Sequence, residues 1–226
     1  MKKVLFVLPS HDQLGNSGHK TGYWLEEFAS PYYEFTDNEY EVTIASPNGG
    51  KPPVDPKSLQ PENQTEYTKR LQNDKDAKEK LENTKLLSDI YSGDYDTLFL
   101  PGGHGPMWDL SEDKDLKKIV EDFYNDDKVI SAVCHGPAGL LQAKDKNGNS
   151  ILKNKRVTGF TNDEEETVKL EKTVPFSLED RLKEVGSNFE KSENFKPFVV
   201  SDGRIITGQN PASAFLAAKK VIEILR

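Results

Sequence analysis

The stretch that decides the fold is Val129-Ile130-Ser131-Ala132-Val133-Cys134-His135-Gly136-Pro137-Ala138-Gly139. An apolar run passes directly into a Gly-Pro-Ala-Gly helix start, and the only cysteine of the chain stands at the change. A strand that breaks sharply into a helix holds its turn residue up at the edge of a sheet, as a G-x-S-x-G elbow does with its serine. The amide groups and dipole of the helix favour thiolate over thiol. Cys134 is therefore a candidate nucleophile with His135 beside it; the alternative is a buried thiol that packs as a small hydrophobe.

Short apolar runs recur along the chain and predict strands between helical stretches. They occupy residues 4–8, 40–46, 97–100, 129–133 and 156–160. Because they lack strict alternation, both faces of these strands should be covered, as in a parallel sheet. Helix starts are predicted at Ser111 and Ser177 and after Asn210-Pro211, and residues 198–207 predict a hairpin. The pattern predicts an α/β fold with a doubly wound, mostly parallel sheet sandwiched by helices.

Size, charge and cysteine content limit the possible classes of function. The 226 residues suffice for one α/β domain that spans 1–226 and buries a proper core. With 30 basic and 38 acidic side chains the net charge is −8. This negative charge does not favour binding to nucleic acid or to an anionic membrane. No stretch approaches the ~20 apolar residues of a membrane span. A single cysteine suits a reducing compartment, so we expect a cytoplasmic protein.

Residues 51–90 interrupt the strand and helix pattern. Pro52, Pro53 and Pro56 open this segment, and residues 62–89 are rich in Lys, Glu, Asp and Asn with sparse leucines. Charge runs usually mark solvated faces. We therefore interpret 51–90 as a charged helical insertion in the single domain; a lid over the functional site is the alternative.

A second glycine cluster, Pro101-Gly102-Gly103-His104-Gly105-Pro106, directly follows the run at 97–100. Ligands of open α/β sheets bind beyond the carboxyl ends of the strands, so this loop and Cys134 should share one crevice. Glycines let backbone N–H groups point into that crevice, as an oxyanion site requires. Gly103 and His104 are the candidate oxyanion- and substrate-binding residues. The loop has neither the G-x-x-x-x-G-K-[ST] nor the G-x-G-x-x-G signature of a phosphate-binding loop, so a nucleotide site is not predicted. The remaining alternative is a simple glycine turn.

Several motifs together resemble those of the ThiJ/PfpI superfamily of class I glutamine-amidotransferase-like proteins. They are PGGHG at 101–105, AVCHGPA at 132–138, VTGFT at 157–161 before an acidic run, TGQNPAS at 207–213, and Lys20-Thr21-Gly22 followed by a glutamate and Pro31. The chain is most similar to the small single-domain branch of glyoxalase III enzymes and heat-shock chaperones. The resemblance covers nearly the whole chain. It implies a flavodoxin-like sandwich, usually a homodimer, with a Cys-His-Glu/Asp constellation and a separate glutamate beside the thiol.

Helical geometry suggests which glutamate lies beside the thiol. At ~100° per residue, Trp24, Leu25 and Phe28 share one apolar face of the first helix, with Glu27 at its margin and Glu26 nearly opposite. Glu27 is the one that can be drawn inward. A carboxyl in such a half-buried place should have a raised pKa and can share a proton with a thiolate. The alternative is that both glutamates are solvent-exposed charges.

The residue that orients His135 has three candidates, Glu164, Glu165 and Glu166. Counting without gaps from residues 159–161 places the acidic position of the family on Glu165. Nothing local anchors that register, so the two neighbours stay open. No C-x-x-C or H-E-x-x-H spacing supports a metal site, and we expect no metal.

The resemblance implies a glutathione-independent glyoxalase that converts methylglyoxal, or a similar 2-oxoaldehyde, to D-lactate or the corresponding 2-hydroxy acid. Cys134 would form a hemithioacetal, His135 would shift a proton through an enediol, and backbone N–H groups near Gly103 would stabilise the oxyanion. The oxidation levels change within the substrate, so no cofactor is expected. The alternatives are a cysteine peptidase or amidohydrolase, a protein deglycase, and a holding chaperone or oxidative-stress sensor.

Overall fold

Four of the five apolar runs of the sequence form the centre of a seven-stranded sheet with the strand order β3-β2-β1-β4-β5-β9-β8. The computed structural model describes residues 1–226. The strands of this sheet are β1 (Lys3–Val7), β2 (Glu41–Ser46), β3 (Lys85–Leu86), β4 (Thr97–Leu100), β5 (Val129–Val133), β8 (Val199–Asp202) and β9 (Ile205–Gly208). Only the pairing of β8 with β9 is antiparallel, and this is the predicted hairpin. The mostly parallel, doubly wound sheet confirms the predicted fold class.

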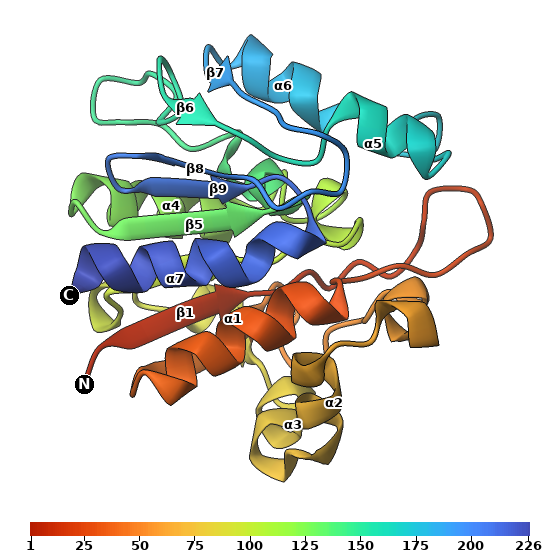
Figure 1. The fold of residues 1–226 in the computed structure, drawn as a ribbon. Coiled ribbons are helices and arrows are strands. Elements are labelled where there is room, and N and C mark those ends of the chain that lie inside the picture. The colour runs from red at the N-terminus through yellow and green to blue at the C-terminus, as the bar shows by residue number, and fades with distance from the viewer.

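Helices cover both faces of the sheet (Figure 1). On one face lie α1 (Leu25–Asp37) and α7 (Ala214–Leu225), which pack against each other; α4 (Lys114–Asn125) packs on β4 and β5 from the other face. Alternate residues of β1 point to opposite faces, so Val4 and Phe6 join the core under α1 and α7, whereas Leu5 and Val7 join the core under α4. Burial on both faces is why these strands have apolar runs without alternation.

The run at residues 156–160 does not join the main sheet, so that prediction is wrong. Only β6 (Arg156–Val157) is a strand, and it pairs with β7 (Asn188–Phe189) in a separate two-stranded sheet. The residues that follow bind the ends of the central strands instead. Thr158 N–H donates to Thr207 Oγ1 at 2.8 Å, and Phe160 N–H donates to the carbonyl of Cys134 at 2.9 Å. This stretch therefore closes over the carboxyl end of β5, next to α5 (Asn162–Thr167) and α6 (Leu178–Glu184).

The predicted helix after Cys134 is only a short 3-10 helix at Gly136–Leu140. Close packing explains this geometry. A Cβ on Gly136 would lie 2.2 Å from the carbonyl oxygen of Leu100, and one on Gly139 would lie 2.9 Å from the Leu116 side chain. This short 3-10 helix has a weaker dipole than the α-helix that the sequence predicts. It therefore stabilises a Cys134 thiolate less.

Residues 51–90 contain α2 (Glu66–Asn73) and α3 (Lys75–Glu82), which lie beside α1 at the lower end of the view in Figure 1. Thr65 caps α2 and donates its hydroxyl to Glu26 of α1, and Arg70 forms an ion pair with Asp37. The proline-rich start of the segment forms 3-10 turns rather than a longer helix. None of the helices of the chain has both the length and the apolar character needed to cross a membrane.

Candidate active site

Cys134 sits in a left-handed backbone conformation, with φ at 58°, at the carboxyl end of β5. This conformation costs a non-glycine residue about 1–3 kcal/mol, so its neighbours must hold it. The Cys134 N–H donates to the carbonyl of Gly208 at 2.9 Å, and its carbonyl accepts the N–H of Phe160 at 2.9 Å. The turn is thus tied to β9 on one side and to the segment after β6 on the other.

The glycine pair after β4 lets this loop contact the cysteine turn. A Cβ on Gly102 would lie 2.7 Å from the backbone nitrogen of His135 and 2.8 Å from Glu27 Oε2. Gly103 has φ at 88°, and a Cβ there would lie 2.3 Å from the carbonyl oxygen of Gly22. No other residue fits at either position. The Gly103 N–H points to Cys134, and this contact acts to lower the pKa of the Cys134 thiol.

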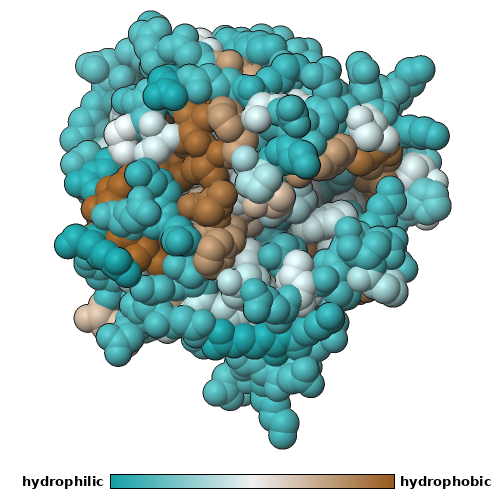
Figure 2. Space-filling model, viewed as in Figure 1, coloured by the Kyte–Doolittle hydropathy of each residue, from teal (hydrophilic) through white to brown (hydrophobic).

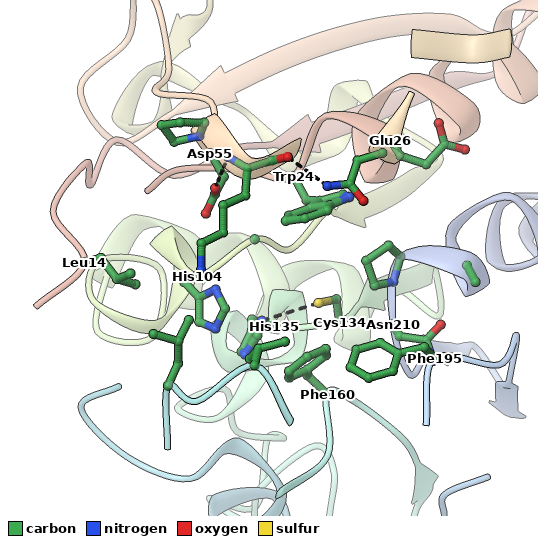
Figure 3. Close-up of a pocket in the computed structure, with 18 of the residues that line it drawn as sticks. Leu14, Trp24, Glu26, Asp55, His104, Cys134, His135, Phe160, Phe195 and Asn210 are labelled. Carbon is green, nitrogen blue, oxygen red and sulfur yellow. Dashed lines mark hydrogen bonds between the residues drawn. The ribbon is translucent and has the colours of Figure 1, made fainter. Parts of the chain in front are cut away.

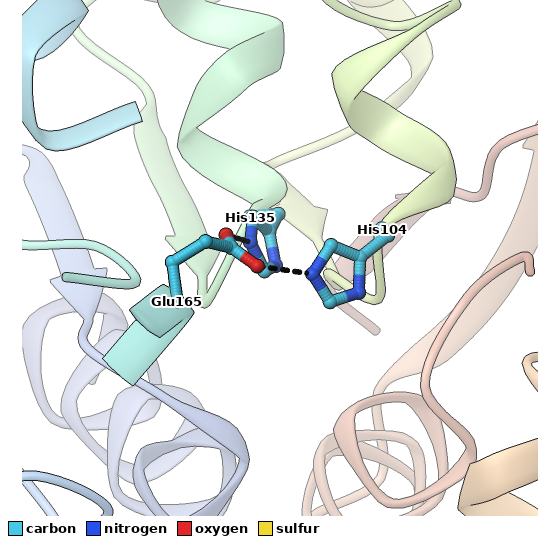
Figure 4. Close-up of side chains that lie close together, drawn as sticks. All are labelled: His104, His135 and Glu165. Carbon is cyan, nitrogen blue, oxygen red and sulfur yellow. Dashed lines mark hydrogen bonds and ion pairs between the residues drawn. The ribbon is translucent and has the colours of Figure 1, made fainter. Parts of the chain in front are cut away.

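Two histidines bind one carboxylate beside the thiol (Figure 4). The distance from His135 Nε2 to Glu165 Oε2 is 2.7 Å, and the distance from His104 Nε2 to Glu165 Oε1 is also 2.7 Å. An ionised carboxylate only accepts, so each imidazole donates its Nε2–H. The other nitrogen of His135, Nδ1, lies 3.3 Å from Cys134 Sγ and is left free to accept the thiol proton. Cys134, His135 and Glu165 are therefore connected in the order of a catalytic triad, in which a thiol contacts an imidazole and a carboxylate orients that imidazole.

The three adjacent glutamates have different surroundings. Glu164 is fully buried and accepts hydrogen bonds from the side chains of Gln209 and Asn210 and from the Phe195 N–H, at 3.0, 2.9 and 2.7 Å. Glu166 is exposed. Of the three, only Glu165 reaches His135, which is the register that the gap-free count predicts; its catalytic role stays a prediction.

Glu27 lies deeper than the sequence predicts. Its side chain is fully buried instead of half-buried, because α1 presses it against the loop after β4. Glu27 Oε2 accepts the Gly102 N–H at 2.7 Å, while the buried Oε1 has no hydrogen-bond partner. Burial raises the pKa of Glu27 to about 8, against the effect of the Gly102 hydrogen bond.

The surroundings of Cys134 hold its proton more firmly than the sequence predicts. Burial and the adjacent Glu27 carboxylate raise the pKa of the thiol well above its usual value. Burial and the nearby His104 lower the pKa of His135, so this imidazole is neutral and can act as a base. Cys134 and Glu27 titrate together, because ionising either one disfavours ionising the other. When Glu27 holds the proton, its carboxyl can donate to a thiolate.

A cavity of about 840 Å³ opens over this group of residues. Cys134, His135 and His104 lie at its base, and Trp24, Phe160, Phe195 and Phe215 provide aromatic walls (Figure 3). Asp55 to Lys57 and Glu62 to Thr65 also line it, so the start of the 51–90 segment borders the site while α2 and α3 do not. Figure 2, which has the same view as Figure 1, shows a mostly hydrophilic surface with a hydrophobic patch to the left of its centre.

Sequence comparison identifies the family to which this arrangement belongs. The model of the DJ-1/PfpI family matches residues 20–224. The chain belongs to the DJ-1/PfpI family. It is 35% identical over 231 residues to the protein named Glyoxalase 3 of Candida albicans, covering 98% of each chain. It is 32% identical over 234 residues to the glutathione-independent glyoxalase HSP31 of Saccharomyces cerevisiae, covering 100% of this chain and 98% of that one.

Solved structures of this family have the same fold over their whole length. The crystal structure of glyoxalase III from Candida albicans matches with a TM-score of 0.91 and 33% identity, covering 98% of this chain and 96% of that one. The Rapid Encystment Protein of 24 kDa from Francisella tularensis matches with a TM-score of 0.96 and 42% identity, covering 100% of both chains. The two solved structures and this chain thus share one DJ-1/PfpI fold.

In this DJ-1/PfpI chain, the residues that the sequence assigns to the catalytic and oxyanion sites surround one site, whereas Glu164 and Glu166 do not reach His135. Cys134, His135, Glu27 and Gly103 meet at the carboxyl ends of β4 and β5, and Glu165 joins them from α5. The sequence analysis placed His104 at the substrate but did not foresee its hydrogen bond to Glu165.

Sequence reasoning also missed a signal that removes one of the three glutamates, Glu164, from the candidates. Thr161 and Glu164 form a capping box at the start of α5, in which each side chain binds the backbone N–H of the other. The T-x-x-E spacing at these positions is the sequence signature of such a cap. It assigns Glu164 to the helix terminus and leaves Glu165 and Glu166 as candidates, of which the structure places Glu165 against His135.

Proposed function

We propose that this chain is a glutathione-independent glyoxalase that converts methylglyoxal, or a similar 2-oxoaldehyde, to the 2-hydroxy acid. The observation that carries the proposal is the position of Cys134 between a neutral base and a protonated acid. His135 Nδ1 lies 3.3 Å from its sulfur, and the buried Glu27 carboxyl lies on the other side. Shifting a proton between adjacent carbons needs these groups around a covalently held substrate. The names of the relatives support the same activity.

The first step is addition of the thiol to the aldehyde. His135 accepts the Cys134 proton at Nδ1, and the sulfur forms a bond to the aldehyde carbon. The carbonyl electron pair moves to oxygen, which takes up a proton to give a hemithioacetal. The backbone N–H groups of Gly103 and His135 stabilise the developing oxyanion. Glu165 holds the His135 ring through Nε2 and stabilises its positive charge after proton uptake.

The second step moves hydrogen without any net oxidation. Neutral His135 removes the hydrogen of the former aldehyde carbon as a proton, which leaves an enediol. A proton then returns to the neighbouring carbon, and the product is a 2-hydroxyacyl thioester on Cys134. Water hydrolyses this thioester and releases the 2-hydroxy acid with the free thiol. One carbon is oxidised while its neighbour is reduced, so the electrons balance within the substrate.

Glu27 stores and supplies a proton during these reaction steps. A carboxyl with a pKa of about 8 keeps its proton at neutral pH and can donate to the thiolate. It can also give a proton to, and recover one from, the reacting carbons and oxygens. Gly102 fixes its orientation through the 2.7 Å hydrogen bond to Oε2.

Kinetics with two substrate classes test the proposed activity. The enzyme should release D-lactate from methylglyoxal without glutathione and should leave fluorogenic peptides intact. Cys134→Ala should lose turnover and keep its circular dichroism spectrum, because the change removes little volume. Peptide cleavage without D-lactate release would favour a cysteine peptidase or amidohydrolase. Suppression of aggregation that survives in Cys134→Ala would point to a holding chaperone, for which Leu59, Tyr91 and Leu216 are among the few large apolar side chains exposed.

Three further expectations accompany this proposal. We infer that residues 1–226 act as one domain, that the protein forms a homodimer, and that it works in the cytoplasm. The resemblance to the small single-domain branch supports the first two, and the lone thiol, which needs a reducing compartment, supports the third. Light scattering after gel filtration should give twice the mass of the chain.

A further inference from the structure

Three metal-ligating side chains converge on the wall of the cavity. The potential donor atoms of His104, His135 and Glu165 all lie within 4.8 Å of one another. The two imidazole rings lie side by side, with centroids 4.2 Å apart, and the carboxylate joins their Nε2 atoms (Figure 4). The carboxylate is nearly enclosed, and both histidines line the cavity.

This donor set suits zinc. Two imidazoles and one carboxylate are the protein ligands of a common class of open zinc site, in which the fourth position faces a cavity. Zinc binds these atoms at about 2.0–2.2 Å, so tetrahedral ligand atoms are about 3.3 Å apart. The two contacts of 2.7 Å between Nε2 atoms and Glu165 need to widen by about 0.6 Å to reach this separation.

We propose that His104, His135 and Glu165 form a binding site for zinc, and that zinc bound there inhibits the enzyme. Cys134 is not a ligand of this site, because His135 presents Nδ1 to the sulfur and the opposite nitrogen, Nε2, to Glu165. The inhibitory consequence rests on the proposed function, whereas the binding itself does not.

Inhibition follows from the lone pairs of His135. In the free enzyme its proton sits on Nε2 and the Nδ1 lone pair can take the proton of Cys134. A zinc ion occupies the Nε2 lone pair, so the ring proton must move to Nδ1. No lone pair is then left to accept a proton, and the base is blocked. The ion also engages Glu165, which otherwise stabilises the protonated ring.

Zinc binding is best measured in the Cys134→Ala background, because this removes the competing thiol. Calorimetric titration with zinc chloride at pH 7.5 should show one saturable site per chain. Adding His104→Gln or Glu165→Gln should weaken binding at least tenfold. The matched controls are His19→Gln, a histidine that also lines the cavity, and Glu166→Gln, the exposed neighbour of Glu165; both should leave the affinity unchanged.

X-ray absorption of the zinc-loaded wild-type protein supplies a readout that needs no substitution. The spectrum should contain two imidazole nitrogens and oxygen ligands without sulfur. Zinc should also inhibit methylglyoxal turnover by the wild type, and EDTA should reverse the inhibition. A sulfur ligand, no saturable site in Cys134→Ala, or unchanged affinity after His104→Gln would each overturn the proposed site. Binding with the predicted ligands but no methylglyoxal turnover would contradict the proposed function and leave the zinc site standing.

Discussion

Glu164 and Glu165 are adjacent in the chain, yet their carboxylates belong to different networks. Glu165 binds His135 Nε2 at 2.7 Å, whereas Glu164 accepts from Asn210 Nδ2 at 2.9 Å. One carboxylate therefore binds His135, the base of the proposed mechanism, and the other holds together the segments that carry part of the cavity wall.

The first prediction concerns Glu165. Glu165→Gln should lower kcat for methylglyoxal by two to four orders of magnitude, because the amide no longer fixes the His135 tautomer or stabilises the protonated ring; loss of the carboxylate from a catalytic triad costs about 10⁴-fold. Glu166→Gln is the matched control and should keep wild-type kinetics, since its side chain is exposed. Equal kinetics for the two variants would remove Glu165 from the mechanism.

The second prediction concerns Glu164. Its buried carboxylate accepts hydrogen bonds from Gln209, Asn210 and the Phe195 N–H, and Glu164→Gln disturbs them. The substituted amide group places a donor against these donors, so the free energy of unfolding should fall by about 3 kcal/mol. Urea denaturation measures this loss. An unchanged midpoint would mean that the hydrogen-bond network contributes little to stability.

The third prediction is the pH dependence of stability caused by Glu27. Burial raises its pKa to about 8 in the folded protein from the usual value of 4.5. The folded state thus binds the proton more tightly than the unfolded state does. Protonation of Glu27 therefore contributes fully to the free energy of unfolding below about pH 4.5, and this contribution is lost as the pH rises through 8. Between pH 5 and pH 8 the wild type should lose stability relative to Glu27→Gln, by up to about 1.4 kcal/mol per pH unit. Parallel urea midpoints for the two proteins across this range would contradict the burial of an ionisable Glu27.

The turn at Cys134 and the positions of the central strands in the chain could be predicted from the sequence because their signals are local. An apolar run that ends in Cys134-His135-Gly136 predicts a buried strand followed by a sharp turn. The glycine pair at Gly102 and Gly103 predicts a tight loop in which the backbone comes close to its neighbours. The capping box was equally local, and using it would have distinguished Glu164 from Glu165.

Other features depend on contacts between distant segments and leave no periodic pattern. The burial of Glu27 follows from the Gly102 loop, which is 75 residues away. The convergence of His104 with His135 and Glu165 follows from three separate connections after β4, β5 and β6. No spacing rule for metal or catalytic motifs includes such residues, so only the folded structure brings them together.

The most direct test of the account is the origin of the hydrogen on the second carbon of lactate. Methylglyoxal should be turned over in deuterated water and the D-lactate analysed by proton NMR, with a control that D-lactate itself does not exchange on the enzyme. Proton abstraction by His135 gives an enediol whose new C–H hydrogen equilibrates with solvent, so the account predicts mainly deuterium at this carbon. Lactate that carries only the original hydrogen of the substrate would indicate an internal hydride shift and would contradict the roles given to His135 and Glu27.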